Sequence, residues 1–300
     1  MTKPRHGPLM AGEPVQLTDP KGRTHLITLR AGASFHTHRG MLSHDDIIGG
    51  PDGNVVRSGG GTPYVVFRPL LADFTLAAKR GAAVVYPKDA AQIVAFADVF
   101  PGARVLEAGA GSGALSCWLL RAVGDQGTLV SFERRPDFAE IARRNVEEFF
   151  GGSPPAWQLV LGEFGRPGDD HGLAEPACFD RVVLDLLAPW DCLEAAAEIL
   201  APGGLACCYV ATTTQLSRTV EALRGHGGFD EPAAWENLAR GWHVEGLAVR
   251  PEHRMVGHTG FLVTARRLAP GVIAPPRRRR PAKGAQEEDH SERSGVLRPR

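Results

Sequence analysis

The sequence has few of the features that mark a membrane protein, a secreted scaffold or a metal site. Among its 300 residues, no apolar run approaches the length of a membrane span. The opening stretch, MTKPRHGPLMAGEP, has no apolar core of the kind found in secretory signals. The five cysteines show no C-x-x-C spacing and lie mostly in apolar runs. We therefore expect buried, reduced thiols in a cytoplasmic protein.

The chain also has no excess of charge of either sign. It carries 34 Lys and Arg residues against 34 Asp and Glu residues, which argues against bulk electrostatic binding of nucleic acid. The charges are unevenly spread, because residues 1–70 and the tail after Gly271 contain more Lys and Arg than Asp and Glu. With 43% hydrophobic and 23% charged residues, the composition is that of an ordinary globular protein.

The most informative stretch is RVLEAGAGSGAL, residues 104–115. An apolar run ends in Glu107, glycines follow at positions 109, 111 and 113, and an apolar helical pattern begins at Ala114. This order predicts a buried strand, a glycine turn and a helix. Glycines in such a turn allow positive φ angles and let a ligand approach the backbone closely.

Two cofactors, a dinucleotide and S-adenosylmethionine, use a turn of this kind. Gly109, Gly111 and Ala114 satisfy the G-x-G-x-x-G/A pattern, and Glu133 follows at a spacing suited to a ribose. Glu107, however, lies close to where a dinucleotide would place its pyrophosphate, which a carboxylate would repel. Because the ammonium and sulfonium groups of S-adenosylmethionine suit that carboxylate, the loop favours this cofactor over NAD or a purely structural turn.

The whole chain predicts two folded parts and a tail. Residues 13–68 have the short alternating runs of a small barrel or curled sheet with four or five strands. Residues 103–268 alternate strand and helix patterns, which predicts a parallel, doubly wound α/β sheet. We expect a small β-rich N-terminal domain at 1–74, a Rossmann-like methyltransferase domain at 75–269 and a disordered basic tail at 270–300.

Three local expectations concern the edges of the predicted site. Asp89 is expected to be the N-cap of a helix that precedes the glycine turn. A helix over 190–200 is expected to end at the Pro-Gly-Gly of 202–204. Residues 242–250 and 260–266 are expected to pair with each other as the closing strands of the sheet.

Acidic residues follow four of the predicted strands, namely Glu107, Glu133, Glu163 and Asp185. In a doubly wound sheet, functional residues collect at the carboxyl ends of the strands. Any one of these carboxylates could be a surface salt bridge, but four in equivalent positions predict a ligand site. Glu133 is placed to accept both hydroxyls of a ribose, and Glu163 to accept a hydrogen bond from the amino group of an adenine.

Asp185 is expected to contact the methyl acceptor. It closes RVVLDLLAPW, where enzymes that methylate the exocyclic amine of adenine carry an Asn/Asp-Pro-Pro-aromatic tetrapeptide. A lone carboxylate fits an acceptor nitrogen within a ring better than an exocyclic amine. The alternative is that Asp185 only caps a helix or forms a buried ion pair.

His36, His38 and His44 lie close together in FHTHRGMLSHDD. A structural zinc site needs four ligands, and neither a cysteine nor another obvious ligand is near. We therefore expect no metal, and predict that these histidines lie in turns, at the surface or facing RNA.

Several segments jointly resemble a known family. VLEAGAGSGAL, FERRPDFAEIARRNV, VVLDLLAPW, YPKDAAQIV and HTGFLVTARRL are similar to the tRNA adenine-N1 methyltransferases of bacteria and archaea, which modify adenine 58 of the T loop. The FHTHRG segment and the small N-terminal β module resemble the actinobacterial branch of that family. The resemblance covers roughly residues 12–270 and leaves out the tail.

The resemblance implies a class I S-adenosylmethionine-dependent methyltransferase fold with an antiparallel last strand, a cytoplasmic homotetramer and tRNA as substrate. It implies that Asp185 is catalytic and that Tyr86 and His258 lie near the target pocket. Glu163 stands where the family often has Asp. The residues implied to hold the cofactor are Glu107, Gly109, Gly111, Ser112, Gly113, Ala114, Leu115, Glu133, Phe138, Glu163 and Asp185.

Two other functions remain open from the sequence. The glycine turn also suits a methyltransferase that acts on a protein carboxylate or a small molecule. A non-catalytic RNA-binding subunit could keep the fold without the chemistry, although the presence of both Glu133 and Asp185 favours an enzyme.

Overall fold

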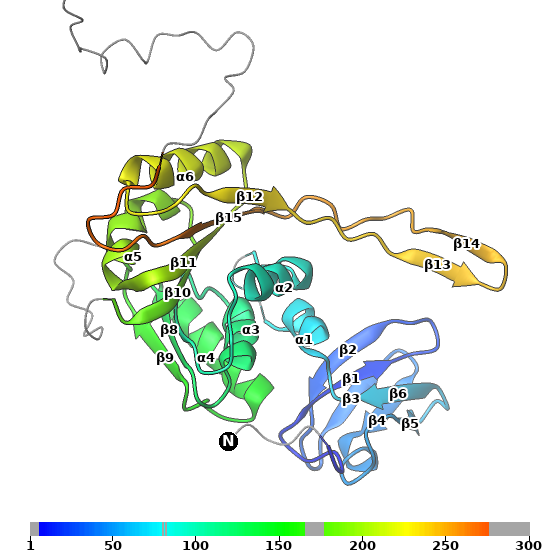
Figure 1. Ribbon diagram of the computed structural model, residues 1–300. Helices are drawn as coiled ribbons and strands as arrows, with labels where there is room; N and C mark the ends of the chain where they lie inside the picture. The colour runs from blue at the N-terminus through cyan, green and yellow to red at the C-terminus, as the bar shows by residue number, and fades with distance from the viewer. Residues whose placement is uncertain (1–5, 80, 82, 166–176, 276–300) are drawn as a thin grey trace, which may run out of the picture.

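The computed structural model describes residues 6–79, 81, 83–165 and 177–275 (Figure 1). These residues form a four-stranded sheet, a seven-stranded sheet and two hairpins of two strands each. No helix in this part of the chain is both long and apolar enough to cross a membrane. The arginine run of the expected tail, residues 277–280, lies outside the described residues.

The N-terminal module is a four-stranded antiparallel sheet with strand order β2-β1-β6-β5 and a separate β3–β4 hairpin. Alternate residues of β1, Val15 and Leu17, are fully buried and pack with Tyr64 and Val66 of β6 in a core of their own. This confirms the predicted β-rich module. The strands are β1 (Pro14–Thr18), β2 (Thr24–Thr28), β3 (Ser34–Thr37), β4 (Gly40–Ser43), β5 (Asn54–Arg57) and β6 (Pro63–Phe67), with a 3-10 helix η1 (His44–Asp46) after β4.

Two helices join this module to the larger sheet. Helix α1 (Leu71–Ala77) contains residue 74, where the sequence suggested a boundary, and Phe74 packs on the ring of Phe149. Helix α2 (Pro87–Phe96) begins with Pro at its first position, and Tyr86 is the N-cap residue. The expectation that Asp89 caps this helix is therefore wrong, because Asp89 lies in the first turn and is only 1% exposed.

The seven-stranded sheet has the order β12-β15-β11-β10-β7-β8-β9. Strands β9, β8, β7, β10 and β11 run parallel, and β15 is antiparallel to β11. This confirms the predicted doubly wound sheet and its antiparallel strand. The strands are β7 (Arg104–Ala108), β8 (Thr128–Glu133), β9 (Trp157–Leu161), β10 (Phe179–Asp185), β11 (Leu200–Val210), β12 (Ala233–Glu236) and β15 (Phe261–Arg266).

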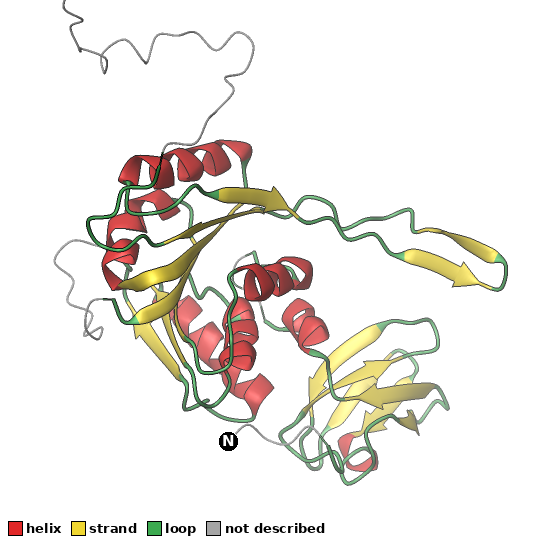
Figure 2. Cartoon of the chain, viewed as in Figure 1, coloured by secondary structure: helices red, strands yellow, loops and turns green. Residues whose placement is uncertain are grey.

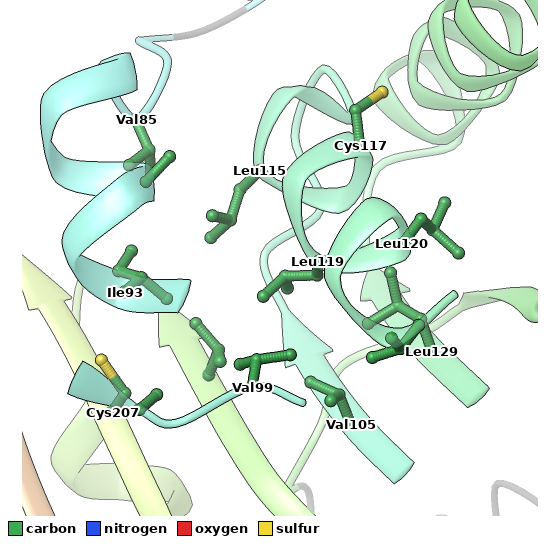
Figure 3. Packing of buried hydrophobic residues seen from close by; sticks show 14 of the residues in the cluster. Val85, Ile93, Val99, Val105, Leu115, Cys117, Leu119, Leu120, Leu129 and Cys207 are labelled. Carbon is green, nitrogen blue, oxygen red and sulfur yellow. The ribbon is translucent and has the colours of Figure 1, made fainter. Parts of the chain in front are cut away.

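Helices cover both faces of this sheet (Figure 2). Alternate residues of a strand point to opposite faces, so Val105 packs in one core with α2 and α3, whereas Leu106 packs in a second core with α5 and α6. Figure 3 shows Ile93 of α2 and Leu119 of α3 within the first core. The helices are α3 (Ala114–Val123), α4 (Pro136–Phe150), α5 (Leu193–Ile199) and α6 (Thr213–His226), with a 3-10 helix η2 (Pro189–Cys192) before α5.

The predicted pairing of residues 242–250 with 260–266 is wrong. Strand β15 pairs with β12 and β11, whereas β13 (Trp242–Glu245) and β14 (Ala248–Pro251) pair with each other. Gly246, with a φ of 53°, closes the turn of this hairpin. In Figure 1 the hairpin projects far from the sheet, and we call residues 238–258 the arm.

The expected break at residues 202–204 is also misplaced. Helix α5 already ends at Ile199, and strand β11 begins at Leu200. The partners of β10 shift from Leu200 to Leu205, so the Pro-Gly-Gly segment forms an irregularity within a strand.

Candidate active site

The glycine turn lies between β7 and α3. Gly109, Gly111 and Gly113 have φ angles of 92°, 55° and 74°, which side chains rarely adopt. A Cβ atom at Gly109 would lie 2.1 Å from the backbone oxygen of Asp185, and one at Gly113 would lie 2.9 Å from that of Ala142. The glycines thus let the ends of β7 and β10 approach each other and seat the turn against α4.

Glu107 is completely buried at the end of β7. The hydroxyls of Ser116 and Ser131 both donate to its Oε2 atom at 2.6 Å. Its Oε1 atom is buried and has no hydrogen-bond partner among the residues that the structure describes. A buried carboxylate oxygen without a donor is costly, so this atom is suited to a ligand that brings one.

Glu133 ends β8 and is 5% exposed. The backbone N–H groups of Gly111 and Arg135 donate to its two carboxylate oxygens at 2.9 and 3.0 Å. The guanidinium of Arg135 lies 3.4 Å from the same carboxylate and 3.3 Å from the centre of the Phe138 ring. Glu133 is therefore fixed in position by the glycine turn on one side and by Arg135 on the other.

A cavity of about 600 Å³ opens at the carboxyl ends of β7, β8, β9 and β10. This volume is in the range of small-molecule sites. Gly109, Gly111, Glu133, Glu163 and Asp185 all line it. Three of the four acidic residues expected at the strand ends therefore line one cavity, whereas the fourth, Glu107, is buried beside it and does not line it.

Burial, and to a smaller extent the charges of Glu107 and Glu133, together raise the pKa of Asp185 to about 7. Burial likewise raises the pKa of Glu107 to about 7, against the opposing effect of its hydrogen bonds from Ser116 and Ser131. Carboxylates that disfavour each other's ionisation form an environment that favours a bound cation.

Five further residues that were expected to bind the cofactor do not line this cavity. Ser112 and Leu115 are buried, and the Leu115 side chain packs in the core (Figure 3). Gly113 is the N-cap of α3 and Ala114 its first residue. Phe138 is buried beneath Arg135.

Glu163 lies on the rim of the cavity with its side chain half exposed. Its carboxylate lies 3.7 Å from the guanidinium of Arg134, which follows Glu133. An exposed pair of this kind contributes little to stability, so either side chain can exchange its partner for a ligand at low cost.

Tyr86 and His258 lie outside the residues that line the cavity. Tyr86 is half-buried at the start of α2. His258 bridges two acceptors, with Nε2 2.8 Å from the backbone oxygen of Ala211 and Nδ1 3.1 Å from Glu236. The Ala211 oxygen and then the Glu236 carboxylate raise the pKa of His258. Ala211 directly follows β11, and β11 pairs in the sheet with β10, the strand that ends at Asp185.

Sequence reasoning missed several side chains that support the site. The amide of Asn145 in α4 donates to the backbone oxygens of Ser112 and Lys79 at 2.8 and 2.9 Å, which pins the glycine turn. Ser131 donates to Glu107 and accepts from Trp157. Asn145 is a polar residue on the apolar face of a helix, and Ser131 is a polar residue at an inward position of a strand. This pattern could have identified both from the sequence.

The histidines of the N-terminal module do not converge. His36 and His38 are exposed on the β3–β4 hairpin, whereas His44 is buried and accepts a hydrogen bond from the backbone N–H of Arg30. No group of three or more potential metal ligands occurs in the described ranges.

Comparison with protein families gives two matches. Residues 64–249 match the tRNA methyltransferase complex GCD14 subunit family, and residues 7–56 match a TrmI-like N-terminal family. Among curated proteins, the chain is 39% identical over 254 residues to the tRNA (adenine(58)-N(1))-methyltransferase TrmI of Thermus thermophilus, covering 85% of this chain and 96% of that protein. The tRNA (adenine(57)-N(1)/adenine(58)-N(1))-methyltransferase TrmI of Methanocaldococcus jannaschii is 31% identical, with 83% and 93% covered.

Two solved structures share the fold over most of their length. The tRNA (m1A58) methyltransferase TrmI of Aquifex aeolicus has a TM-score of 0.75 and 26% identity, with 88% of this chain and all of that chain covered (100%). A Thermotoga maritima protein described as a SAM-dependent O-methyltransferase has a TM-score of 0.79 and 29% identity, with 87% and 95% covered. The seven-stranded sheet is therefore the class I methyltransferase fold.

The raised pKa values of Asp185 and Glu107 predict that stability falls as pH rises from about 4 to 7. The folded state holds protons on these carboxyls up to a pKa of about 7, whereas the unfolded chain releases them near the ordinary pKa values of 3.8 and 4.5. The loss is at most about 1.4 kcal/mol per pH unit for each such group. Urea denaturation across this range measures it.

Asp185→Asn, which is nearly isosteric and cannot ionise, should reduce this pH dependence and leave the part due to Glu107. An unchanged slope in the variant would show that Asp185 ionises normally in the folded protein.

Proposed function

The chain belongs to the tRNA methyltransferase GCD14 family, and from this membership we propose that it transfers a methyl group from S-adenosylmethionine to N1 of adenine 58 in the T loop of tRNA. The observation that carries the proposal is that Glu133 and Asp185 line one cavity at the strand ends of a methyltransferase sheet. Glu133 is then available to the cofactor, and Asp185 to the methyl acceptor.

The residues present fit S-adenosylmethionine. Its ammonium would satisfy the orphaned Oε1 of Glu107 directly or through a water. Its ribose hydroxyls would donate to Glu133, and its adenine amine to Glu163 in exchange for Arg134. The other proposed cofactor contacts are Gly109, Gly111, Ser112, Gly113, Ala114, Leu115, Phe138 and Asp185, while Tyr86 and His258 are proposed for the acceptor side.

When bound, S-adenosylmethionine supplies an electrophilic methyl group on a sulfonium. The chain's own contribution begins with charge, because Glu107, Glu133 and Asp185 favour a cationic donor over its neutral product. On the acceptor side, N1 of adenine is already nucleophilic, so no residue has to remove a proton from it first. Asp185 accepts a hydrogen bond from the N6 amine and stabilises the positive charge that grows on the ring.

The target adenine is stacked and paired in a folded T loop, so it must be extruded to reach this cavity. Phosphate contacts are proposed for the basic N-terminal module, whose exposed His36 and His38 lie at the β3–β4 hairpin. The compartment we propose is the cytoplasm. The five free cysteines agree with a reducing environment.

A second acceptor class deserves a test because the Thermotoga maritima relative is described as an O-methyltransferase. A hydroxyl or carboxylate acceptor would not need an acidic residue to stabilise a cationic product. The matching N-terminal module and the two curated relatives favour the tRNA acceptor.

The arm supports the proposed homotetramer. On one face of the β13–β14 hairpin, Trp242 lies opposite Pro251 and Val244 opposite Val249. Trp242, Val244 and Val249 are 60%, 68% and 57% exposed, and Leu247 at the tip is 103% exposed. A two-stranded ribbon is marginal alone, and a one-sided apolar ribbon is stabilised when a second copy covers it.

The proposed acceptor is tested by methyl transfer from labelled S-adenosylmethionine to an unmodified tRNA transcript. We expect label on this transcript and none on the same transcript with adenine 58 changed to guanine, because guanine N1 carries a proton. Label on neither, with cofactor still bound, would contradict the tRNA acceptor and leave another acceptor class.

Asp185→Ala should lower kcat at least about 100-fold, the scale of losing one preorganised charge-stabilising group. The affinity for S-adenosylmethionine, measured by calorimetry, should fall much less than kcat, because Glu107 and Glu133 remain to hold the cofactor. Equal losses in turnover and in cofactor affinity would count against a role for Asp185 in stabilising the acceptor.

Replacing Trp242, Val244 and Val249 by Ser should lower the number of chains per particle, measured by light scattering after size-exclusion chromatography. The matched control is Val55→Ser, a similarly exposed valine (53%) in the N-terminal sheet. A triple variant with the wild-type particle mass would mean that the arm does not hold the subunits together.

A further inference from the structure

Lys88 and Asp89 form a buried ion pair in the first turn of α2, away from the residues that line the cavity. Their side chains are 8% and 1% exposed, and Lys88 Nζ lies 2.7 Å from Asp89 Oδ1. Lys88 Nζ also donates to the backbone oxygen of Asn237 and to the hydroxyl of Thr259, both at 2.6 Å. The three ammonium hydrogens thus have three acceptors.

The second carboxylate oxygen of Asp89 is also fully engaged. It accepts hydrogen bonds from the hydroxyl of Thr259 and from that of Tyr209, the latter at 3.3 Å. The amide of Asn237 donates in return to the backbone oxygen of Lys88 at 3.0 Å. We call these five residues, Lys88, Asp89, Tyr209, Asn237 and Thr259, the root cluster.

The root cluster holds both strands of the arm where they leave the sheet. Asn237 directly follows β12, and Thr259 comes two residues before β15. In Figure 1 the arm extends from this end of β12 and β15, next to α2. One buried ion pair therefore sets where the arm starts relative to α2.

The same cluster reaches the acceptor side of the active site. Tyr209 is the register partner of Asp185 on the neighbouring strand. Its ring packs closely against Gly260, where an added Cβ would lie 2.4 Å from the ring. Tyr86 and His258, both proposed for the acceptor side, are the sequence neighbours of Pro87 and Thr259.

Stability alone does not account for this arrangement. Replacing a buried ion pair by apolar groups of similar shape is often neutral or stabilising, because the charges lose their hydration on burial. What a fully hydrogen-bonded pair does provide is a defined geometry among the elements that it joins.

We infer that Lys88 and Asp89 are positioning residues that fix the arm root, and with it Tyr86 and His258, against Asp185 for the methyl acceptor. This inference rests on the proposed function. The pair acts through Tyr209 and Thr259 and makes no contact with the cofactor cavity in the described residues.

The test is the double variant Lys88→Met, Asp89→Asn, which removes both charges and keeps the side-chain shapes, so no lone charge is left buried. We expect kcat with unmodified tRNA, at saturating cofactor and tRNA, to fall at least tenfold. The Kd for S-adenosylmethionine should stay within threefold, and the unfolding midpoint should stay near that of the wild type.

Two further variants separate positioning from general damage. Thr259→Val removes the hydroxyl that links Lys88 to Asp89 and should also lower kcat. Thr259→Ser keeps a hydroxyl at this position and should retain nearly the wild-type kcat. Arg224→Met, which removes the ion pairs of this α6 residue with Glu221 and with Glu231, should leave kcat unchanged.

Each outcome decides the inference. Wild-type kcat in either the double variant or Thr259→Val overturns it, and so does a parallel loss of kcat, cofactor affinity and thermal stability. A wild-type protein that binds cofactor but methylates no tRNA contradicts the proposed function itself, and the inference falls with it.

Discussion

The site depends on the burial of acidic side chains at neighbouring strand ends, where burial first, and then the nearby carboxylates, disfavours the ionised forms of Glu107 and Asp185. Glu107 is completely buried, with one oxygen that has no hydrogen-bond partner in the described part of the chain. Glu133 is held by two backbone N–H groups, and Asp185 has a pKa raised to about 7. Such a cluster is unfavourable while it is empty of positive charge. The same charges suit a reaction in which a cation donates a methyl group and the acceptor becomes a cation.

Apolar packing within the fold is the main reason that these carboxylates lie close together. Two hydrophobic cores, one on each face of the sheet, hold the parallel strands in register so that their carboxyl ends meet at one edge. Gly109 lets β7 approach the backbone of Asp185 closely, and Asn145 anchors the turn from α4. The carboxylates are therefore placed before any ligand arrives, which is what electrostatic preorganisation requires.

The sequence alone predicted the parts of this picture that depend on local pattern. The glycine turn, the order of strands and helices and the acidic residues at strand ends all follow from short-range signals. Asp89 was misassigned because Asp is favoured both at the N-cap and in the first turn of a helix, and only Pro87 marks the true start. The burial of Lys88 depends on partners 149 and 171 residues away, and the pairing of β12 with β15 spans the whole arm, so no local pattern specifies either.

The most direct test of the account is the identity of the methylated nucleoside. Transfer RNA methylated by the purified protein is digested, and its nucleosides are separated and identified by mass spectrometry. A lone carboxylate at Asp185 that stabilises a cationic ring predicts 1-methyladenosine as the product. N6-methyladenosine, or a methyl group on a ribose or another base, would contradict the role given to Asp185 and the electrostatic account built on it.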